Sequence, residues 1–434
     1  MALHQASVRL TFWQTTIRLA SEYHPKSILI YRAAQAKCSV TQPPNEVSWR
    51  IVENLRKFVT PEIVFGHGAL KLAGRYARNL GARKVFLVSD PGVAQAGWTD
   101  AVAQSLSAEA LNWTVLTDIS PNPRAEETMI GAEQYAAEAC DVIVAVGGGS
   151  VMDCAKAIGI VHTNGRHILE FEGVDRVAVP GPPLICIPTT AGTSSDVSQF
   201  VIICNRFEKR KVAILSKGVV PDVALVDPEP TTTMDAYLTA CTGMDAMVHA
   251  LEALVSTAGS DLTDMHAREA IHRLYTHLPM VIDHPRDIAA RQEVMFGSLA
   301  AGLAFSNASL GAVHAMAHSI GGLFDLPHGE CNSLLMDHVV RFNWPRASHR
   351  YREISPIFGL QLNDRTENEA CEMLADAVAQ FKRRIGITHT LKDCGIRSED
   401  IPQLARTAIG DPCMATNPVA PTINDIESVY AQAL

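Results

Sequence analysis

The chain has 434 residues, 47% of them hydrophobic and 19% charged, with a formal net charge of -9 and a sequence pI near 6.0. This length exceeds what one hydrophobic core usually serves, so we expect two domains of ordinary globular composition. The acidic balance argues against a nucleic-acid binder, and no uncharged apolar run reaches the roughly 18 residues of a membrane-spanning helix. We therefore expect a soluble, cytoplasmic protein with neither nucleic acid nor membrane as a partner.

Residues 1 to 50 differ from the rest, because five basic residues are accompanied only by Glu22 before Glu46 is reached. Acid-poor termini that carry arginine occur in organelle transit peptides, but no apolar signal-peptide core is present. We favour a poorly ordered extension, or a start codon placed too early, over a targeting segment.

Short β-rich runs alternate with helical runs between about Phe58 and Asp227. The strands are expected at EIVFG, KVFLVSD, WTVLTDI, VIVAVGGGS, PLICIPTT, QFVIIC and VALVDPE, with helices such as RAEETMIGAEQYAAEA between several of them. Strands and helices that alternate at this spacing predict βαβ units and a mainly parallel sheet. The first domain is therefore expected to be an α/β dinucleotide-binding domain over residues 51–230.

The β-rich runs disappear from about Thr232 onward, and the remaining residues have a helical pattern. Proline interrupts helices, so we predict breaks at Pro279, Pro285 and Pro345, and another near the sequence DCGI. The second domain is expected to be all-helical over residues 231–434, with the boundary close to Pro228.

Ten cysteines are scattered along the chain without a CxxC pair, and most lie inside apolar runs such as PLICIP. Cytosolic proteins keep such buried thiols reduced. This distribution favours free thiols over disulfides or a cysteine-ligated metal.

A glycine-rich turn follows the buried strand in DVIVAVGGGSVMDCAKAIG. Gly147, Gly148 and Gly149 allow close approach of the backbone to a bulky anion, and the helix that begins at Ser150 offers unpaired N–H groups. A phosphate or pyrophosphate would bind there, although a tight turn without a ligand is the alternative, since the full GxGxxG fingerprint is absent. Asp153 is either a residue of the cap region or a contact to ligand hydroxyls.

A second polar loop, PTTAGTSSDVS, follows another buried strand and contains Thr189, Thr190 and Thr193. Such loops are often ordinary turns, but ligands of open α/β sheets bind outside the carboxyl ends of strands.

Asp90 ends the strand KVFLVSD. It either accepts hydrogen bonds from the adenosine ribose of NAD or caps the following helix.

Potential metal ligands lie in two short apolar segments, GMDAMVHALEAL and GAVHAMAHSIGGLFDLPHGE, and the second segment is expected to end in a turn at Pro327, where His328 lies. Asp245 and His249 are four residues apart and therefore share one face of a helix. A buried carboxylate beside a buried imidazole is costly unless something pairs them, and a divalent metal would do so. His314, His318 and His328 are further candidates. One carboxylate with imidazoles and no thiolate suits Fe(II), Zn(II) or a similar ion.

With these motifs the chain resembles the iron-containing (group III) alcohol dehydrogenases. The matching stretches are PNP, AVGGGSVMDCAKAI, IPTTAGTSSDVS, GMDAMVHALEAL and GAVHAMAHSIGGLFDLPHG, from about residue 58 to the C-terminus. The resemblance implies the metal ligands Asp245, His249, His314 and His328. It places His318 close to the nicotinamide and substrate. It also implies cofactor contacts at Asp90, Asn122, Gly148, Gly149, Ser150, Asp153, Thr189, Thr190, Thr193 and Lys211, to which the glycine turn adds Gly147. The sequence departs from the family pattern at Val419, where relatives often have an arginine, so we expect this residue to alter the substrate channel.

The activity implied is hydride transfer between a small or primary alcohol and NAD, with Fe(2+), or Zn(2+) instead, holding the alcohol oxygen. A metal-dependent hydrolase would explain the metal ligands but not the two loops. A polyol dehydrogenase and a dehydroquinate synthase-like lyase share the fold, but the basic phosphate ligands of the lyase are not found. A catalytically silent NAD sensor is the non-enzyme alternative. The substrate would be a small alcohol or aldehyde, and we expect a homodimer or a larger homo-oligomer.

Overall fold

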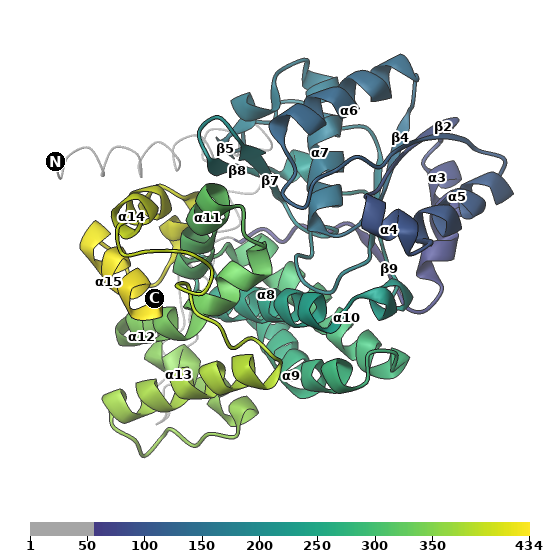
Figure 1. Cartoon of the computed structure of the whole chain (residues 1–434). Helices are drawn as coiled ribbons and strands as arrows, with labels where there is room; N and C mark the ends of the chain where they lie inside the picture. Colours follow the sequence, from purple (N-terminus) through teal and green to yellow (C-terminus); the bar gives the residue numbers. More distant parts are fainter. Residues whose placement is uncertain (1–55) are drawn as a thin grey trace, which may run out of the picture. The chain divides into compact units, whose positions relative to one another are not determined.

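The computed structural model describes residues 56–434. Six parallel strands form the main sheet in the first half of the chain (Figure 1). The order is β1-β9-β6-β4-β2-β3. The strands are β1 (Glu62–Phe65), β2 (Lys84–Val88), β3 (Asn112–Leu116), β4 (Val142–Gly147), β6 (Leu184–Pro188) and β9 (Val223–Val226). Each lies on a predicted β-rich run, so the predicted parallel α/β fold is confirmed. The extension predicted over residues 1 to 50 lies outside the described residues.

Helices cover both faces of this sheet, which explains why its central strands are apolar throughout. The helices α3 (Ala73–Asn79) and α5 (Trp98–Ala108) pack with one set of strand residues, and α6 (Ala125–Ala137) and α7 (Gly149–Asn164) pack with the alternate set. All six residues of β4 are buried. A strand covered on both faces reads as a continuous hydrophobic run, and β4 has that pattern.

A second, three-stranded sheet has the order β5-β8-β7. It consists of β5 (Gly173–Val174), β7 (Phe200–Asn205) and β8 (Arg210–Leu215), and β7 pairs with β8 as an antiparallel hairpin. The predicted strand QFVIIC is therefore correct as a strand, but it belongs to this smaller sheet. The strand β8, with the sequence RKVAIL, was not predicted.

The second half is helical, as predicted. It contains α8 (Ala236–Val255), α9 (Asp261–Asp283), α10 (Ile288–Ala308), α11 (Ala312–Phe324), α12 (His328–Ile354), α13 (Glu367–Arg384), α14 (Ile401–Ile409) and α15 (Ile423–Ala433). The breaks predicted at Pro285 and near DCGI are confirmed. Those predicted at Pro279 and Pro345 are wrong, because both prolines lie inside helices. Buried residues on both sides of each proline hold these helices in the core.

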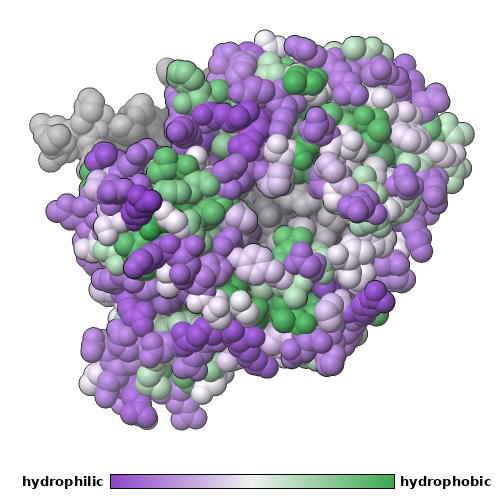
Figure 2. Space-filling model, viewed as in Figure 1, coloured by the Kyte–Doolittle hydropathy of each residue, from purple (hydrophilic) through white to green (hydrophobic). Residues whose placement is uncertain are grey.

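Charged side chains dominate the surface of α13, whose sequence is ENEACEMLADAVAQFKRR. Figure 2 shows this part of the surface, at the lower left, as mostly hydrophilic. Across residues 56–434, no single helix is long and apolar enough to cross a membrane; α10 and α11 satisfy length and composition criteria only as a pair bent by 99°.

Candidate metal and cofactor site

Four side chains predicted as metal ligands converge in the helical half. The Oδ1 atom of Asp245 lies 3.8 Å from Nε2 of His249, 3.7 Å from Nε2 of His314 and 3.8 Å from Nε2 of His328. The first two residues belong to α8, His314 belongs to α11, and His328 is the first residue of α12. Three helices that are distant in sequence thus bring one carboxylate and three imidazoles to the same point.

The close approach of α12 to α8 depends on Gly329. A Cβ atom at this position would lie 2.4 Å from the backbone oxygen of Cys241, a distance that real Cβ atoms do not adopt. Glycine therefore allows the first turn of α12 to pack against α8, which brings His328 to Asp245.

Two buried polar residues that the sequence analysis did not select hold this cluster in place. Glu252, three residues after His249 on α8, accepts hydrogen bonds from Nδ1 of His314 and from the backbone N–H of Val313, both at 2.6 Å. Asn332 donates from Nδ2 to Oδ1 of Asp245 at 2.6 Å. Helical spacing could have identified Glu252, which follows His249 by three residues. Asn332 follows His328 by four residues, but the sequence predicted His328 in a turn, whereas it is the first residue of α12.

The protonation states of Asp245, His249 and His328 fit a divalent cation. His314 must first lose a proton, because the carboxylates of Asp245 and Glu252 outweigh the effect of burial and raise its pKa to about 9. Burial would raise the pKa of Asp245, but the three neighbouring imidazoles outweigh it and hold that pKa well below its ordinary value. Burial lowers the pKa of His249 to about 3 and also lowers that of His328. An ionised carboxylate and neutral imidazoles are the forms that ligate metals. The buried Nδ1 atoms of His249 and His328 have no hydrogen-bond partner within residues 56–434.

His318 lies beside this cluster, one turn after His314 on α11. Its ring stacks on that of His328, with a centroid separation of 5.1 Å and an interplanar angle of 18°. Its Nδ1 atom lies 2.8 Å from Oδ2 of Asp411, so Nε2 is the nitrogen left for a substrate or a solvent proton. Asp411 was not selected from the sequence, because it follows His318 by 93 residues.

A cavity of about 310 Å³ extends from the glycine turn to the Asp/His cluster. Of the predicted cofactor contacts, it is lined by Asn122, Gly148, Gly149, Ser150, Asp153, Thr190, Thr193 and Lys211. Its other end is lined by Asp245, His249, His314, His318 and His328 together with the apolar side chains Phe200, Phe305 and Leu310. Residues from both predicted domains therefore line one cavity, whose volume falls at the lower end of the range for small-ligand sites.

Three predicted cofactor contacts do not line this cavity. Gly147 and Thr189 are the last residue of β4 and the residue after β6, and both are buried. Asp90 caps α4 (Pro91–Gln95), with Oδ1 accepting a hydrogen bond of 2.9 Å from the N–H of Val93. The helix-cap interpretation of Asp90 is thus correct, and a contact between this residue and the ribose of NAD remains a prediction.

The glycine turn leaves the N-terminus of α7 open to the cavity. A Cβ atom at Gly149 would lie 2.6 Å from Cγ2 of Thr193, whereas one at Gly148 would make ordinary contact with Thr190 at 3.4 Å. Asp153 accepts hydrogen bonds from Ser195 Oγ at 2.6 Å and from the N–H of Ile202 at 3.0 Å. Its carboxylate therefore ties α7 to the threonine-rich loop and to β7.

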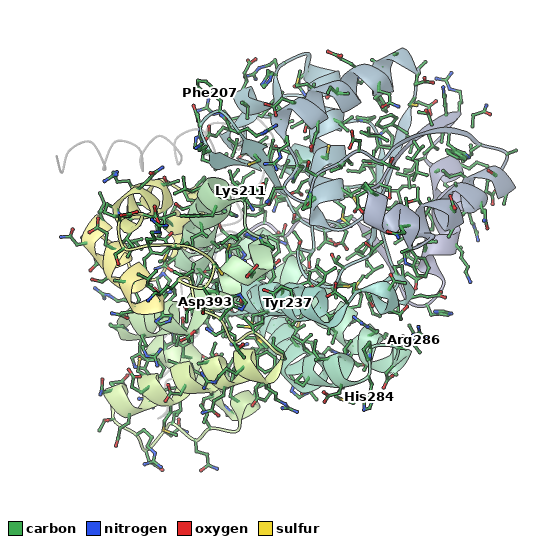
Figure 3. The ribbon with its side chains drawn as sticks, viewed as in Figure 1. Phe207, Lys211, Tyr237, His284, Arg286 and Asp393 are labelled. Atoms are coloured by element: carbon green, nitrogen blue, oxygen red, sulfur yellow. The ribbon has the colours of Figure 1, made fainter. Side chains whose placement is uncertain are left out.

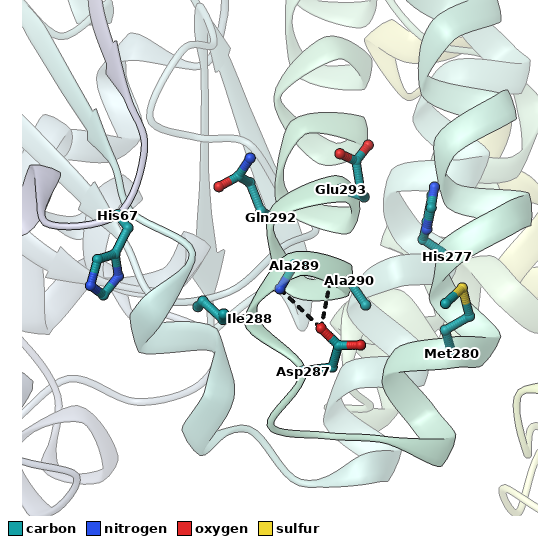
Figure 4. A pocket seen from close by; sticks show the side chains of 9 residues that line it. All are labelled: His67, His277, Met280, Asp287, Ile288, Ala289, Ala290, Gln292 and Glu293. Carbon is teal, nitrogen blue, oxygen red and sulfur yellow. Dashed lines mark hydrogen bonds between the residues drawn. The ribbon is translucent and has the colours of Figure 1, made fainter.

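A separate depression of about 500 Å³ lies between His67 and the helices α9 and α10 (Figure 4). It shares no lining residue with the cavity described above. The carboxylate of Asp287 accepts hydrogen bonds from the N–H groups of Ala289 and Ala290 at 3.0 and 3.1 Å, so it acts as the cap of α10. Figure 4 shows no convergence of the other polar side chains on a common point.

Comparison with known proteins agrees with this geometry. The family described as "Iron-containing alcohol dehydrogenase" matches residues 60–228, and "Fe-containing alcohol dehydrogenase family, C-terminal" matches residues 239–434. Alcohol dehydrogenase 4 of Schizosaccharomyces pombe is 37% identical over 86% of this chain and 87% of its own length. The NAD-dependent methanol dehydrogenase of Bacillus methanolicus is 34% identical over 87% of this chain and 99% of its own length.

A solved structure of 1,3-propanediol oxidoreductase superimposes with a TM-score of 0.85 at 34% identity, covering 88% of this chain and all of that one. Identity above 30% over nearly the full length of these relatives, combined with the two family matches, is sufficient to assign the chain. It belongs to the iron-containing alcohol dehydrogenase family.

Proposed function

We propose that this chain interconverts a small primary alcohol and its aldehyde, using NAD in the cavity between the glycine turn and the Asp/His cluster. As a member of its family it is an oxidoreductase that acts on CH–OH groups. The observation that supports the proposal is one cavity that is lined by the glycine turn and by the Asp245 cluster. A metal-dependent hydrolase would need only the Asp245 cluster and not the glycine turn. The presence of both in one cavity therefore favours a dehydrogenase.

The α/β half supplies the NAD-binding surface. The N-terminus of α7 offers unpaired N–H groups to the pyrophosphate, and Gly148 leaves the backbone uncovered there. Lys211 on β8 lines the same cavity, where its amino group would donate hydrogen bonds to the cofactor. The cofactor accepts the hydride, so these residues contribute position and electrostatics.

Asp245, His249, His314 and His328 are the residues that would hold a divalent iron or zinc ion. When bound, such an ion lowers the pKa of a coordinated hydroxyl group, which makes the alcohol easier to deprotonate. Nε2 of His318 stands next to the cluster and is proposed to take the hydroxyl proton, while Asp411 orients the ring. The balanced reaction converts an alcohol and NAD⁺ to an aldehyde, NADH and a proton.

The pocket at the metal end favours small, uncharged substrates. Phe200, Phe305 and Leu310 line it together with the cluster, and the whole cavity, cofactor region included, is about 310 Å³. The relatives include proteins named for methanol and 1,3-propanediol, which are small alcohols.

We also propose that the enzyme works in the cytoplasm as a homodimer or larger homo-oligomer, with residues 51–230 and 231–434 as its two domains.

The test is an assay of NADH formation with purified full-length protein, NAD and a panel of alcohols, before and after removal and return of Fe(II) or Zn(II). Metal-dependent NADH formation with short primary alcohols is the expected result. Full activity in metal-free protein would refute the proposed role of the cluster. The variant His328→Ala should lose metal and turnover together and still bind NAD, whereas the surface variant His284→Ala should retain all three properties.

A further inference from the structure

A second group of metal-ligating side chains lies outside the cavity. Nε2 of His389 is 2.7 Å from Oε1 of Glu330, and Sγ of Cys394 is 3.6 Å from the same oxygen. The three potential ligand atoms all lie within 4.8 Å of one another. One carboxylate oxygen, one imidazole nitrogen and one sulfur therefore face a common point.

These side chains come from segments that are far apart in the sequence. Glu330 lies in the first turn of α12, and the other two lie in the connection between α13 and α14. Tyr237 in the first turn of α8 borders the group, because its hydroxyl is 3.4 Å from Nε2 of His389. Figure 3 labels Tyr237 and also Asp393, the chain neighbour of Cys394.

Partial exposure makes the group accessible to an ion from solvent. The side chains of Glu330 and His389 are 12% and 23% exposed, and Cys394 is half-buried. Each could reach a shared ion by a small movement, since tetrahedral zinc sites place ligands about 2.0 to 2.3 Å from the metal.

The donor set differs from that of the Asp245 cluster in one decisive way. The Asp245 cluster consists of one carboxylate and three imidazoles, whereas the second group contains a thiol. Thiolate, imidazole and carboxylate together favour Zn²⁺ among common divalent ions. We propose that Glu330, His389 and Cys394 form a second metal site that takes Zn²⁺, with a fourth position open to water on the side of Tyr237.

An ion at this site would connect the α13–α14 segment to the first turn of α12, two residues from His328. Its role would be to fasten that segment, since none of the three ligands lines the cavity. The competing interpretation is a Glu330–His389 ion pair beside an unrelated thiol, with no metal bound. The two interpretations differ in whether the sulfur of Cys394 binds a metal ion.

Cobalt(II) distinguishes them, because a cobalt–thiolate bond gives an intense near-ultraviolet charge-transfer absorption and the Asp245 cluster has no sulfur. Metal-free full-length protein is titrated with Co(II), and bound metal is counted after gel filtration. We expect two equivalents and the sulfur band for the natural sequence. Cys394→Ser and His389→Gln should each remove one equivalent, and both should abolish the band, because the sulfur site then holds no metal.

Two controls make the result specific. Cys140→Ser changes a buried thiol that belongs to neither group, and it should retain two equivalents and the band. His314→Ala disrupts only the first cluster, and it should lose one equivalent while the band persists. Binding of only one equivalent of Co(II) by the natural sequence would overturn the proposal, and so would a sulfur band that persists in Cys394→Ser. The proposal would also fail if added Zn²⁺ did not displace Co(II) from the sulfur site.

Discussion

Oε2 of Glu252 lies 2.6 Å from Nδ1 of His314, and both side chains are almost completely buried. The carboxylate accepts a hydrogen bond from Nδ1–H of the imidazole, so Nε2 is the nitrogen that faces Asp245 and that a metal ion would bind once its proton has left. Residues behind a metal ligand commonly set its orientation and basicity in this manner. Glu252 is thus the positioning residue of the Asp245 cluster, although it does not belong to the ligand set.

The first prediction follows from this contact. Glu252→Gln preserves the size of the side chain but removes the charge that holds the Nδ1 proton. Loss of such a partner typically weakens metal binding by about 10- to 100-fold. Competition with a chromophoric chelator measures the affinity without any turnover. Glu269→Gln, which changes a surface partner of Arg273, should leave the affinity unchanged; an unaltered affinity in Glu252→Gln would show that the contact is only structural.

Metal binding should also depend on pH through His314. Burial alone would lower the pKa of its imidazole, but the carboxylates of Asp245 and Glu252 outweigh that effect and raise the pKa to about 9 in the metal-free protein. The ion must therefore displace a proton from His314 below about pH 9. Zinc affinity should rise about tenfold per pH unit from neutral pH and level off near that pKa. An affinity that stays flat over this interval in a chelator assay would contradict the assignment.

His318 and Asp411 form the next test, because they border the cluster without joining it. His318→Ala should retain its metal and lose about 10² to 10⁴ in turnover rate, the usual contribution of general acid or base assistance. Metal analysis that shows the ion gone would instead make His318 a ligand. Asp411→Asn should lose less rate and should shift the pH dependence of turnover. A role confined to packing would lower thermal stability and leave the pH profile in place.

The sequence predicted the main sheet and the Asp/His cluster because both have local signals. Continuous apolar runs mark strands that are covered on both faces, and spacings of four residues place Asp245 with His249 on one helical face. The strand β8 was missed because its partner β7 stabilises it through pairing, which is not a property of its own residues. Pro279 and Pro345 were wrongly predicted as helix breaks, since core packing outweighs the local cost of a missing N–H.

Contacts between distant segments were beyond the reach of sequence patterns. Glu330 precedes His389 by 59 residues and Cys394 by 64, and no spacing rule connects them. The same holds for His318 and Asp411. Only the packing of the helices brings these pairs together, whereas Glu252 lies on the helical face of His249, which was already identified, and could have been selected.

The last prediction concerns Asp90, which has two separable properties. Its carboxylate caps α4, and its negative charge would repel the 2′-phosphate of NADP if the adenosine ribose of the cofactor binds nearby. Asp90→Ser preserves a side-chain cap and removes the charge, whereas Asp90→Ala removes both. We expect both variants to bind NADP more tightly relative to NAD than the natural sequence does, as measured by fluorescence titration of the reduced cofactors. Only Asp90→Ala should also lose stability, by about 0.5 to 2 kcal/mol in a denaturant titration. If neither variant changes the ratio of the two dissociation constants while Asp90→Ala is still destabilised, Asp90 acts as a helix cap alone.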